Sequence, residues 1–147
     1  MTLERLVDSW LAVRAQFEDD DLDTVIRFRT EMPSENVRLA HPVMMIIKWP
    51  YKTKKDGMPR QADIDRMSAF EDELEVAIEA PLLGIPVACL TGNGRRTWRH
   101  FVADPKTFKA ALQPLLAAHA PEPFLFKQVK DAKWEGLKEL LPLLECR

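Results

Sequence analysis

The stretch TGNGRRTWRHFVAD, residues 91–104, places a Gly-Asn-Gly turn between two runs rich in apolar residues. Asn-Gly favours the positive φ angles that a tight β-hairpin needs, so strands are expected at 84–91 and 95–103. Asp104 can then accept hydrogen bonds as a helix N-cap, and Pro105 suits the first helical position because its φ angle is already helical. The stretch therefore predicts a hairpin that leads directly into a helix.

The chain on either side of this hairpin divides into further short elements. Residues 61–80 repeat apolar side chains at three- and four-residue spacing, which is typical of an amphipathic helix. Alternating or continuous apolar runs predict strands elsewhere. The expected strands are 10–17, 24–30, the second half of 37–49 after Pro42, 84–91, 95–103 and 123–129. The expected helices are 61–80, 104–120, which Pro114 should kink or end, and 131–144.

This order of elements predicts an α+β fold. The expected architecture is a two-layer sandwich with a ferredoxin-like βαββαβ core, preceded by a β-hairpin and followed by a short C-terminal helix. The length of 147 residues suits one compact unit, so residues 1–147 are taken as a single domain.

Charge and cysteine usage exclude several classes of protein. The formal net charge of -2 argues against a dedicated nucleic-acid binder, which usually carries a basic surplus. Cys89 and Cys146 lie far apart without a CxxC partner, so neither a zinc site nor a disulfide framework is indicated. We expect Cys89 to be a buried thiol and Cys146 to be exposed. The N-terminus lacks an apolar signal core and the run 43–47 is too short to cross a bilayer, so we expect a cytoplasmic protein without membrane contact.

Several short motifs resemble a known family. WPYKTKKDGMP, FEDELEVAIE and GIPVACLTGNGRRTWRHFVAD, followed by a tryptophan before a leucine-rich helix, resemble the bacterial domain-of-unknown-function family 695 over about residues 10–144. Trp98 departs from the pattern, in which Glu or Phe is expected beside the arginine. The family has no established catalytic residues. Some members are joined to a domain similar to the ribonuclease E inhibitor B family, so the resemblance implies a ferredoxin-like plan and points to regulation.

The strand at 95–103 is a candidate for RNA binding. In ferredoxin-like RNA-recognition modules the corresponding strand carries aromatic and basic side chains that contact bases. Alternation places Arg95, Arg99 and Phe101 on one face, and Arg96 on the other with Trp98, His100 and Val102. If Trp98 and Val102 face the helices, the first face is open. The alternative is that Trp98 belongs to the core and the arginines pair with nearby acids.

Two charged segments are further candidate binding surfaces. The helix at 61–80 carries Glu71, Asp72 and Glu75, which could form a solvated face, brace the hairpin arginines or the Lys-rich loop, or dock a basic partner. The loop at 50–60 carries Lys54 and Lys55 and could touch an anionic ligand, although a mobile solvated loop is the expected state.

The sequence lacks the spacing that catalysis or metal binding requires. His41, His100 and His119 are isolated on different elements without HxH or HxxxH spacing, so no metal or cofactor is expected. His100 is expected to be half-buried and hydrogen-bonded. Cys89 lies inside a strand and no GxSxG nucleophile motif is present, so no catalytic residue is assigned.

Three hypotheses on function remain. The first is a non-catalytic protein-binding module, monomeric or weakly dimeric, that acts as a regulator, adaptor or immunity-type protein through 63–79, 18–23 and 92–99. The second is RNA binding through Arg95, Arg99 and Phe101. The third is a ligand-binding protein or small enzyme with a pocket between the sheet and the loop 52–60.

Overall fold

A six-stranded antiparallel sheet forms the centre of the molecule. The computed structural model describes residues 9–16, 22–79, 83–119, 122 and 124–145. The strands lie in the order β1-β2-β4-β5-β3-β6. Within this order, β4-β5-β3-β6 is the antiparallel arrangement of a ferredoxin-like core, and the N-terminal hairpin extends it beside β4. The strands are β1 (Trp10–Ala15), β2 (Thr24–Arg29), β3 (Val43–Pro50), β4 (Ile85–Gly92), β5 (Arg95–Val102) and β6 (Leu125–Lys130).

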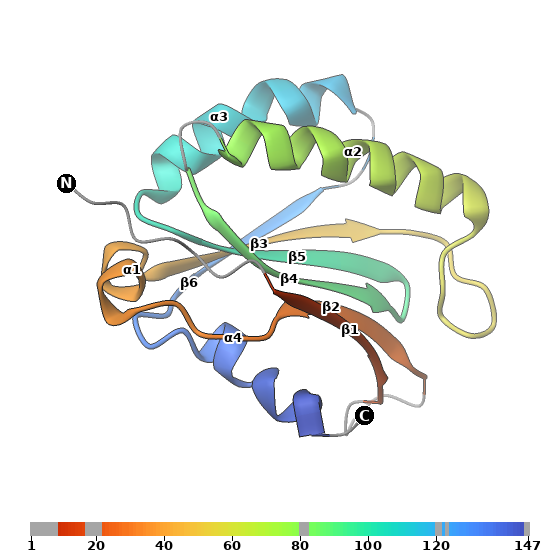
Figure 1. The fold of residues 1–147 in the computed structure, drawn as a ribbon. Helices are drawn as coiled ribbons and strands as arrows, with labels where there is room; N and C mark the ends of the chain where they lie inside the picture. Colours follow the sequence, from red (N-terminus) through yellow and green to blue (C-terminus); the bar gives the residue numbers. More distant parts are fainter. Residues whose placement is uncertain (1–8, 17–21, 80–82, 120–121, 123, 146–147) are drawn as a thin grey trace.

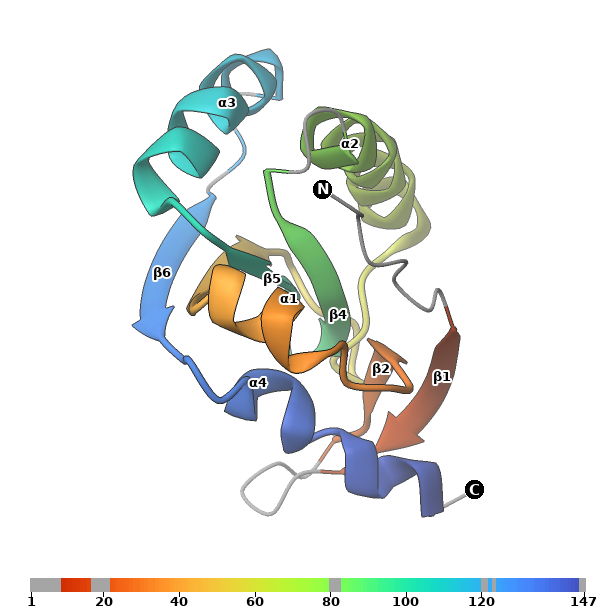
Figure 2. The same cartoon turned by 60° about the vertical axis from the view of Figure 1, so that its left-hand side comes forward.

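Helices cover the sheet unequally. The two long helices, α2 and α3, lie side by side over one face, and the short α4 lies against the opposite face (Figures 1 and 2). The α+β sandwich and its C-terminal helix are therefore confirmed. The helices are α1 (Glu35–Ala40), α2 (Gln61–Glu79), α3 (Pro105–Ala118) and α4 (Glu135–Lys138), followed by a 3-10 turn, η1 (Leu141–Glu145).

The hairpin and the start of α3 form as the local sequence predicts. Asn93 and Gly94 have φ angles of 51° and 85°, which are the positive values of a type I′ turn. The carboxylate of Asp104 accepts hydrogen bonds from the Lys106 amide (3.0 Å) and from the Thr107 hydroxyl (2.8 Å). Hydrogen bonds from the Lys106 amide and the Thr107 hydroxyl lower the pKa of Asp104, with the hydroxyl contributing most. Helix α3 continues through Pro114, so this proline does not end it.

The strand expected in the second half of 37–49 is present as β3, which begins at Val43. Residues 35–40 form the helix α1, which the sequence analysis did not predict. The hydroxyl of Ser34 accepts a hydrogen bond from the Val37 amide (3.4 Å), so this serine caps the helix. Pro42, whose ring lacks an N–H donor, separates α1 from the strand.

Each face of the sheet has its own apolar core. Under α2 and α3, Trp49, Phe70 and Trp98 pack with ring centroids 5.2–6.4 Å apart. Val102 belongs to the same cluster, so Trp98 and Val102 face the long helices, a point that the sequence left open. On the opposite face, Phe101 packs with residues of β2, β3, β4 and α4.

Candidate functional site

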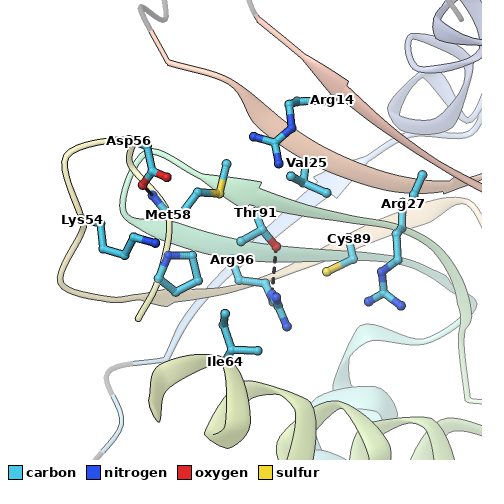
Figure 3. Close-up of a pocket in the computed structure, with 12 residues that line it drawn as sticks. Arg14, Val25, Arg27, Lys54, Asp56, Met58, Ile64, Cys89, Thr91 and Arg96 are labelled. Carbon is cyan, nitrogen blue, oxygen red and sulfur yellow. Dashed lines mark hydrogen bonds between the residues drawn. The ribbon is translucent and has the colours of Figure 1, made fainter. Parts of the chain in front are cut away.

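A cleft of about 430 Å³ opens where the N-terminal hairpin carries the sheet beyond the cover of α2 and α3. Strands β1, β2, β4 and β5 form its floor, the loop 51–60 forms one wall, and Ile64 in the first turn of α2 forms another (Figure 3). This placement agrees with the pocket that the third hypothesis expected beside the loop. Lys54 lines the cleft, whereas Lys55 is exposed outside its lining.

The register of the sheet aligns the residues of the cleft floor. Arg14 lies opposite Val25, Val25 lies opposite Thr91, and Thr91 lies opposite Arg96. These four residues therefore form one row across four adjacent strands, with an arginine at each end and a hydroxyl between them. Neighbouring strands are about 4.8 Å apart, so the row spans about 14 Å between the two arginine backbones.

Most of the positive charge in the cleft lacks an internal counter-charge. The Nε atom of Arg96 donates to the Thr91 hydroxyl (2.8 Å), which orients the guanidinium without neutralising it (Figure 3). Within the described part of the chain, neither Arg14 nor Lys54 nor Arg96 forms an ion pair. Asp56 is the acid of the lining, and its carboxylate accepts a hydrogen bond from the Met58 amide (3.0 Å).

Arg27 differs from the other cations of the cleft because it has a carboxylate partner. Its guanidinium contacts the Glu71 carboxylate at 2.5 Å, and the same oxygen accepts a hydrogen bond from the Trp98 indole N–H (2.8 Å). Glu71 therefore braces the sheet against α2. Asp72 and Glu75 are exposed on the outer side of α2, and burial, followed by the charges of Glu71 and Asp72, raises the pKa of Glu75.

The wall formed by the loop 51–60 is fastened to the hairpin. The Gly94 amide donates to the Gly57 carbonyl (3.1 Å), and the Tyr51 amide donates to the Gly94 carbonyl (2.8 Å). The Tyr51 hydroxyl also donates to the Gly57 carbonyl (2.8 Å), and burial raises the pKa of Tyr51 to about 12. Gly57 has a φ of 82° and fits where a Cβ would lie 3.0 Å from the Asn93 amide nitrogen. The loop backbone is thus tied to the sheet, while Lys54 and Lys55 remain exposed.

The thiol of Cys89 lies in the cleft floor between these charges. Burial, together with the negative charge of Glu71, raises its pKa. The side chain is therefore a neutral thiol, as the sequence predicts for a buried cysteine, and thiols are much weaker nucleophiles than thiolates. Cys146 lies outside the described residues, and so does most of the acidic stretch 18–23.

The opposite face of the sheet is not open, and the expectation that it is open is wrong. Phe101 is fully buried, and its ring stacks on Trp134 with centroids 4.0 Å apart and an interplanar angle of 8°. The guanidinium of Arg99 donates to the Gly136 carbonyl (2.7 Å) and to the Glu139 carboxylate (2.6 Å). Neither side chain is placed to contact a nucleic-acid base, and Arg95 alone of that trio is exposed, at the hairpin end.

A capping arrangement that the sequence analysis missed holds α4 against this face. The two carboxylate oxygens of Asp131 accept hydrogen bonds from the Glu135 and Gly136 amides, both at 2.8 Å. Trp134 has a φ of 58°, and its indole N–H donates to the His41 carbonyl (2.9 Å). A Cβ on Gly136 would lie 2.3 Å from the Met44 sulfur, so any larger residue there would displace the Met44 side chain. The signal in the sequence is Asp131, four residues before Glu135.

The environment of His100 also differs from expectation. The side chain is only 3% exposed rather than half-buried, and its Nδ1 has no hydrogen-bond partner among the described residues. Its ring packs beside Phe108 with centroids 5.7 Å apart. Burial lowers the pKa of His100 to about 3, so the imidazole is neutral at physiological pH.

The described ranges hold neither a cluster of metal-ligating side chains nor a helix that could span a membrane. No three His, Cys, Asp or Glu side chains of those ranges cluster in a way that could hold a metal ion. None of the described helices combines the length and the apolar character that crossing a bilayer requires.

The model of the family of unknown function DUF695 matches residues 8–141, which is most of the chain. The chain belongs to this family. The DUF695 match includes every strand of the sheet, the loop 51–60 and α4. It therefore covers both the cleft and the opposite face of the sheet, which α4 covers and which is called the sealed face below. No curated protein and no solved structure matches the chain.

Because DUF695 is a family of unknown function, the candidate site is assigned from the geometry of the cleft. The sequence analysis singled out Arg96 and Lys54 but missed Arg14, Arg27 and Thr91. Alternation within 10–15 and 24–29 places Arg14 and Arg27 each on one face of its strand. That alternation could have revealed a basic face of the hairpin, but not which part of the chain would lie above it.

Proposed function

We propose that this protein is a non-catalytic module that binds another protein, as a regulator, adaptor or immunity-type protein, and that the cleft receives an acidic segment of that partner. The observation that carries the proposal is the set of cations at Arg14, Lys54 and Arg96, which the described residues leave without a carboxylate partner. Charges arranged in this way steer an oppositely charged partner and fix its register.

The cleft also offers apolar contact between its charges. Val25, Met58, Pro59 and Ile64 line it beside the cations. An acidic peptide could therefore pair its carboxylates with the arginines and pack intervening apolar side chains on this surface, which is the usual composition of a protein interface. Because the loop wall is hydrogen-bonded to the hairpin, little ordering of the loop backbone opposes binding.

The state of the polar groups in the cleft favours binding over catalysis. The thiol of Cys89 is protonated, the Glu71 carboxylate is paired with Arg27, and the Asp56 carboxylate accepts from the loop backbone. A protonated thiol is a poor nucleophile, because the thiolate is the reactive form.

A small anionic ligand is the second candidate. The volume of about 430 Å³ lies within the range of roughly 300–1,000 Å³ that is usual for small-molecule sites. A compact anion would contact the same cations without needing the rim of the cleft.

The test is a comparison of affinity captures from extracts of the native cell. Tagged wild-type protein is compared with R14E/R96E, and with R60E/K127E as a control that makes the same change of charge at exposed residues outside the cleft. Wild type and control should retain the same protein partner, and R14E/R96E should lose at least about 90% of it, as expected for loss of two charge-assisted contacts. Equal capture by all three proteins would contradict the proposal.

A further inference from the structure

The cleft carries a defined excess of positive charge. Arg27 is neutralised by Glu71, whereas Arg14, Lys54 and Arg96 form no ion pair within the described residues. Asp56 is the single carboxylate among the described residues of the lining. These described residues, three cations and one carboxylate, leave a net charge of about plus two for a ligand to balance. A carboxylate supplies one negative charge, but a phosphate monoester supplies about 1.5 to 2 near neutral pH.

The donors of the cleft also approach from separate directions. Arg14 extends from the edge strand β1, Lys54 extends from the loop, and Arg96 rises from β5 (Figure 3). A carboxylate offers two oxygens in one plane, so it pairs best with donors that lie in that plane. A tetrahedral group with three terminal oxygens can accept from donors on several sides at once.

Arg96 is prepared for such a group by its neighbour. Because its Nε donates to Thr91, the guanidinium plane is fixed while the Nη groups remain available to a ligand. Ile64 belongs to the first turn of α2, so the positive end of that helix dipole adjoins the cleft and favours an anion there.

We infer that the acidic group recognised by this cleft is a phosphate monoester on a side chain of the partner protein. The inference rests on the proposed function, which supplies a protein as the partner. The apolar residues Val25, Met58 and Pro59 lie beside the cations and would contact the residues that flank the phosphorylated side chain.

The experiment measures binding of the full chain to three fluorescent peptide pools by anisotropy. Each pool has degenerate flanking positions and one fixed central residue, which is phosphoserine, glutamate or serine. The phosphoserine pool should bind at least about tenfold more tightly than the glutamate pool, and the serine pool should bind most weakly. R14Q and R96Q should each weaken binding of the phosphoserine pool by about tenfold. R60Q, which removes an exposed arginine outside the lining, should change it less than about twofold.

Other outcomes of the binding measurements would contradict the phosphate inference or the proposed protein partner. Equal affinity for phosphoserine and glutamate would overturn the phosphate inference and leave the proposed function standing. Absence of binding to the phosphoserine pool, or binding that R14Q and R96Q leave unchanged, would overturn the inference. Free phenyl phosphate is the last arm. If it binds as tightly as the phosphoserine pool, the flanking residues contribute nothing, and a small phosphate ester replaces a protein as the ligand.

Discussion

Arg96 and Arg99 lie on the same strand, three residues apart, and have opposite surroundings. Arg99 points to the face that α4 covers, where it donates to the Gly136 carbonyl and the Glu139 carboxylate. Arg96 points to the other face, into a cleft where Thr91 orients it and no described carboxylate pairs with it. The comparison separates two roles of similar residues: one arginine fastens a helix, and the other is available to a partner.

The same contrast extends to the two regions around these arginines. The sealed face combines a stacked aromatic pair, a glycine packed closely against Met44 and a capping aspartate. The cleft combines exposed cations with a loop that is hydrogen-bonded to the hairpin. Substitutions in the sealed face should therefore reduce stability, whereas substitutions in the cleft should reduce binding.

The largest expected effect comes from W134A. Trp134 is fully buried, stacks on Phe101 and donates to the His41 carbonyl, so the substitution leaves a cavity and an unpaired acceptor. The free energy of unfolding should fall by about 3–5 kcal/mol, measured by urea denaturation. L39A, at a residue that is 63% exposed, should change the free energy of unfolding by less than about 0.5 kcal/mol. A change as small for W134A would show that α4 does not seal this face.

The next effect concerns His100, on the face of β5 that α2 and α3 cover. Burial lowers its pKa to about 3, whereas the unfolded chain has the ordinary value of 6.5. Below pH 6.5 the imidazole of His100 binds a proton in the unfolded chain but stays neutral in the folded chain. Protonation therefore favours the unfolded chain, and the stability that the neutral imidazole contributes is fully present above pH 6.5 and is lost as the pH falls toward 3. Between pH 7 and pH 5 the loss should be about 2 kcal/mol.

H100L isolates that contribution from other titrating groups. The difference in unfolding free energy between wild type and H100L, measured by denaturation at several pH values, should change by about 2 kcal/mol between pH 7 and pH 5. A difference that stays constant over this range would show that His100 is not held neutral by burial.

The smallest effect compares the two arginines directly. R99M should lower the free energy of unfolding by about 1 kcal/mol because it removes hydrogen bonds to Gly136 and Glu139 and leaves a carbonyl without its donor. R96M should change it by less than about 0.5 kcal/mol, because among the described residues the guanidinium of Arg96 forms one hydrogen bond, to Thr91. The free energies of unfolding are measured by chemical denaturation. Equal losses for R99M and R96M would show that Arg99 does not stabilise the fold more than Arg96 does.

Local chemistry explains which parts of the fold can be predicted from the sequence. The hairpin at Asn93-Gly94 and the helix start at Asp104 depend on neighbouring residues alone, and both are confirmed. The strand expected in the second half of 37–49 is present as β3, but the helix α1 before it was not predicted, because its capping by Ser34 outweighs the β preference of a short apolar run.

The candidate site depends on long-range contacts that a single sequence does not reveal. Alternation correctly placed Arg96 and Arg99 on opposite faces, but it could not show that a helix 36 or more residues later would cover Arg99. Equally, the meeting of Arg14, Lys54 and Arg96 requires the pairing of β2 with β4, which joins residues 60 to 66 positions apart. These features follow from topology rather than from local preference.

Arginine side-chain Nε–Hε spectra of the ¹⁵N-labelled chain, recorded during titration with a peptide rich in glutamate and aspartate, compare the two regions within one sample. An acidic peptide in the cleft should shift the Arg14 and Arg96 signals and leave the Arg99 signal in place, because Arg99 is held under α4. Shifts confined to Arg99, or shifts of equal size at all three arginines, would contradict a binding site in the cleft.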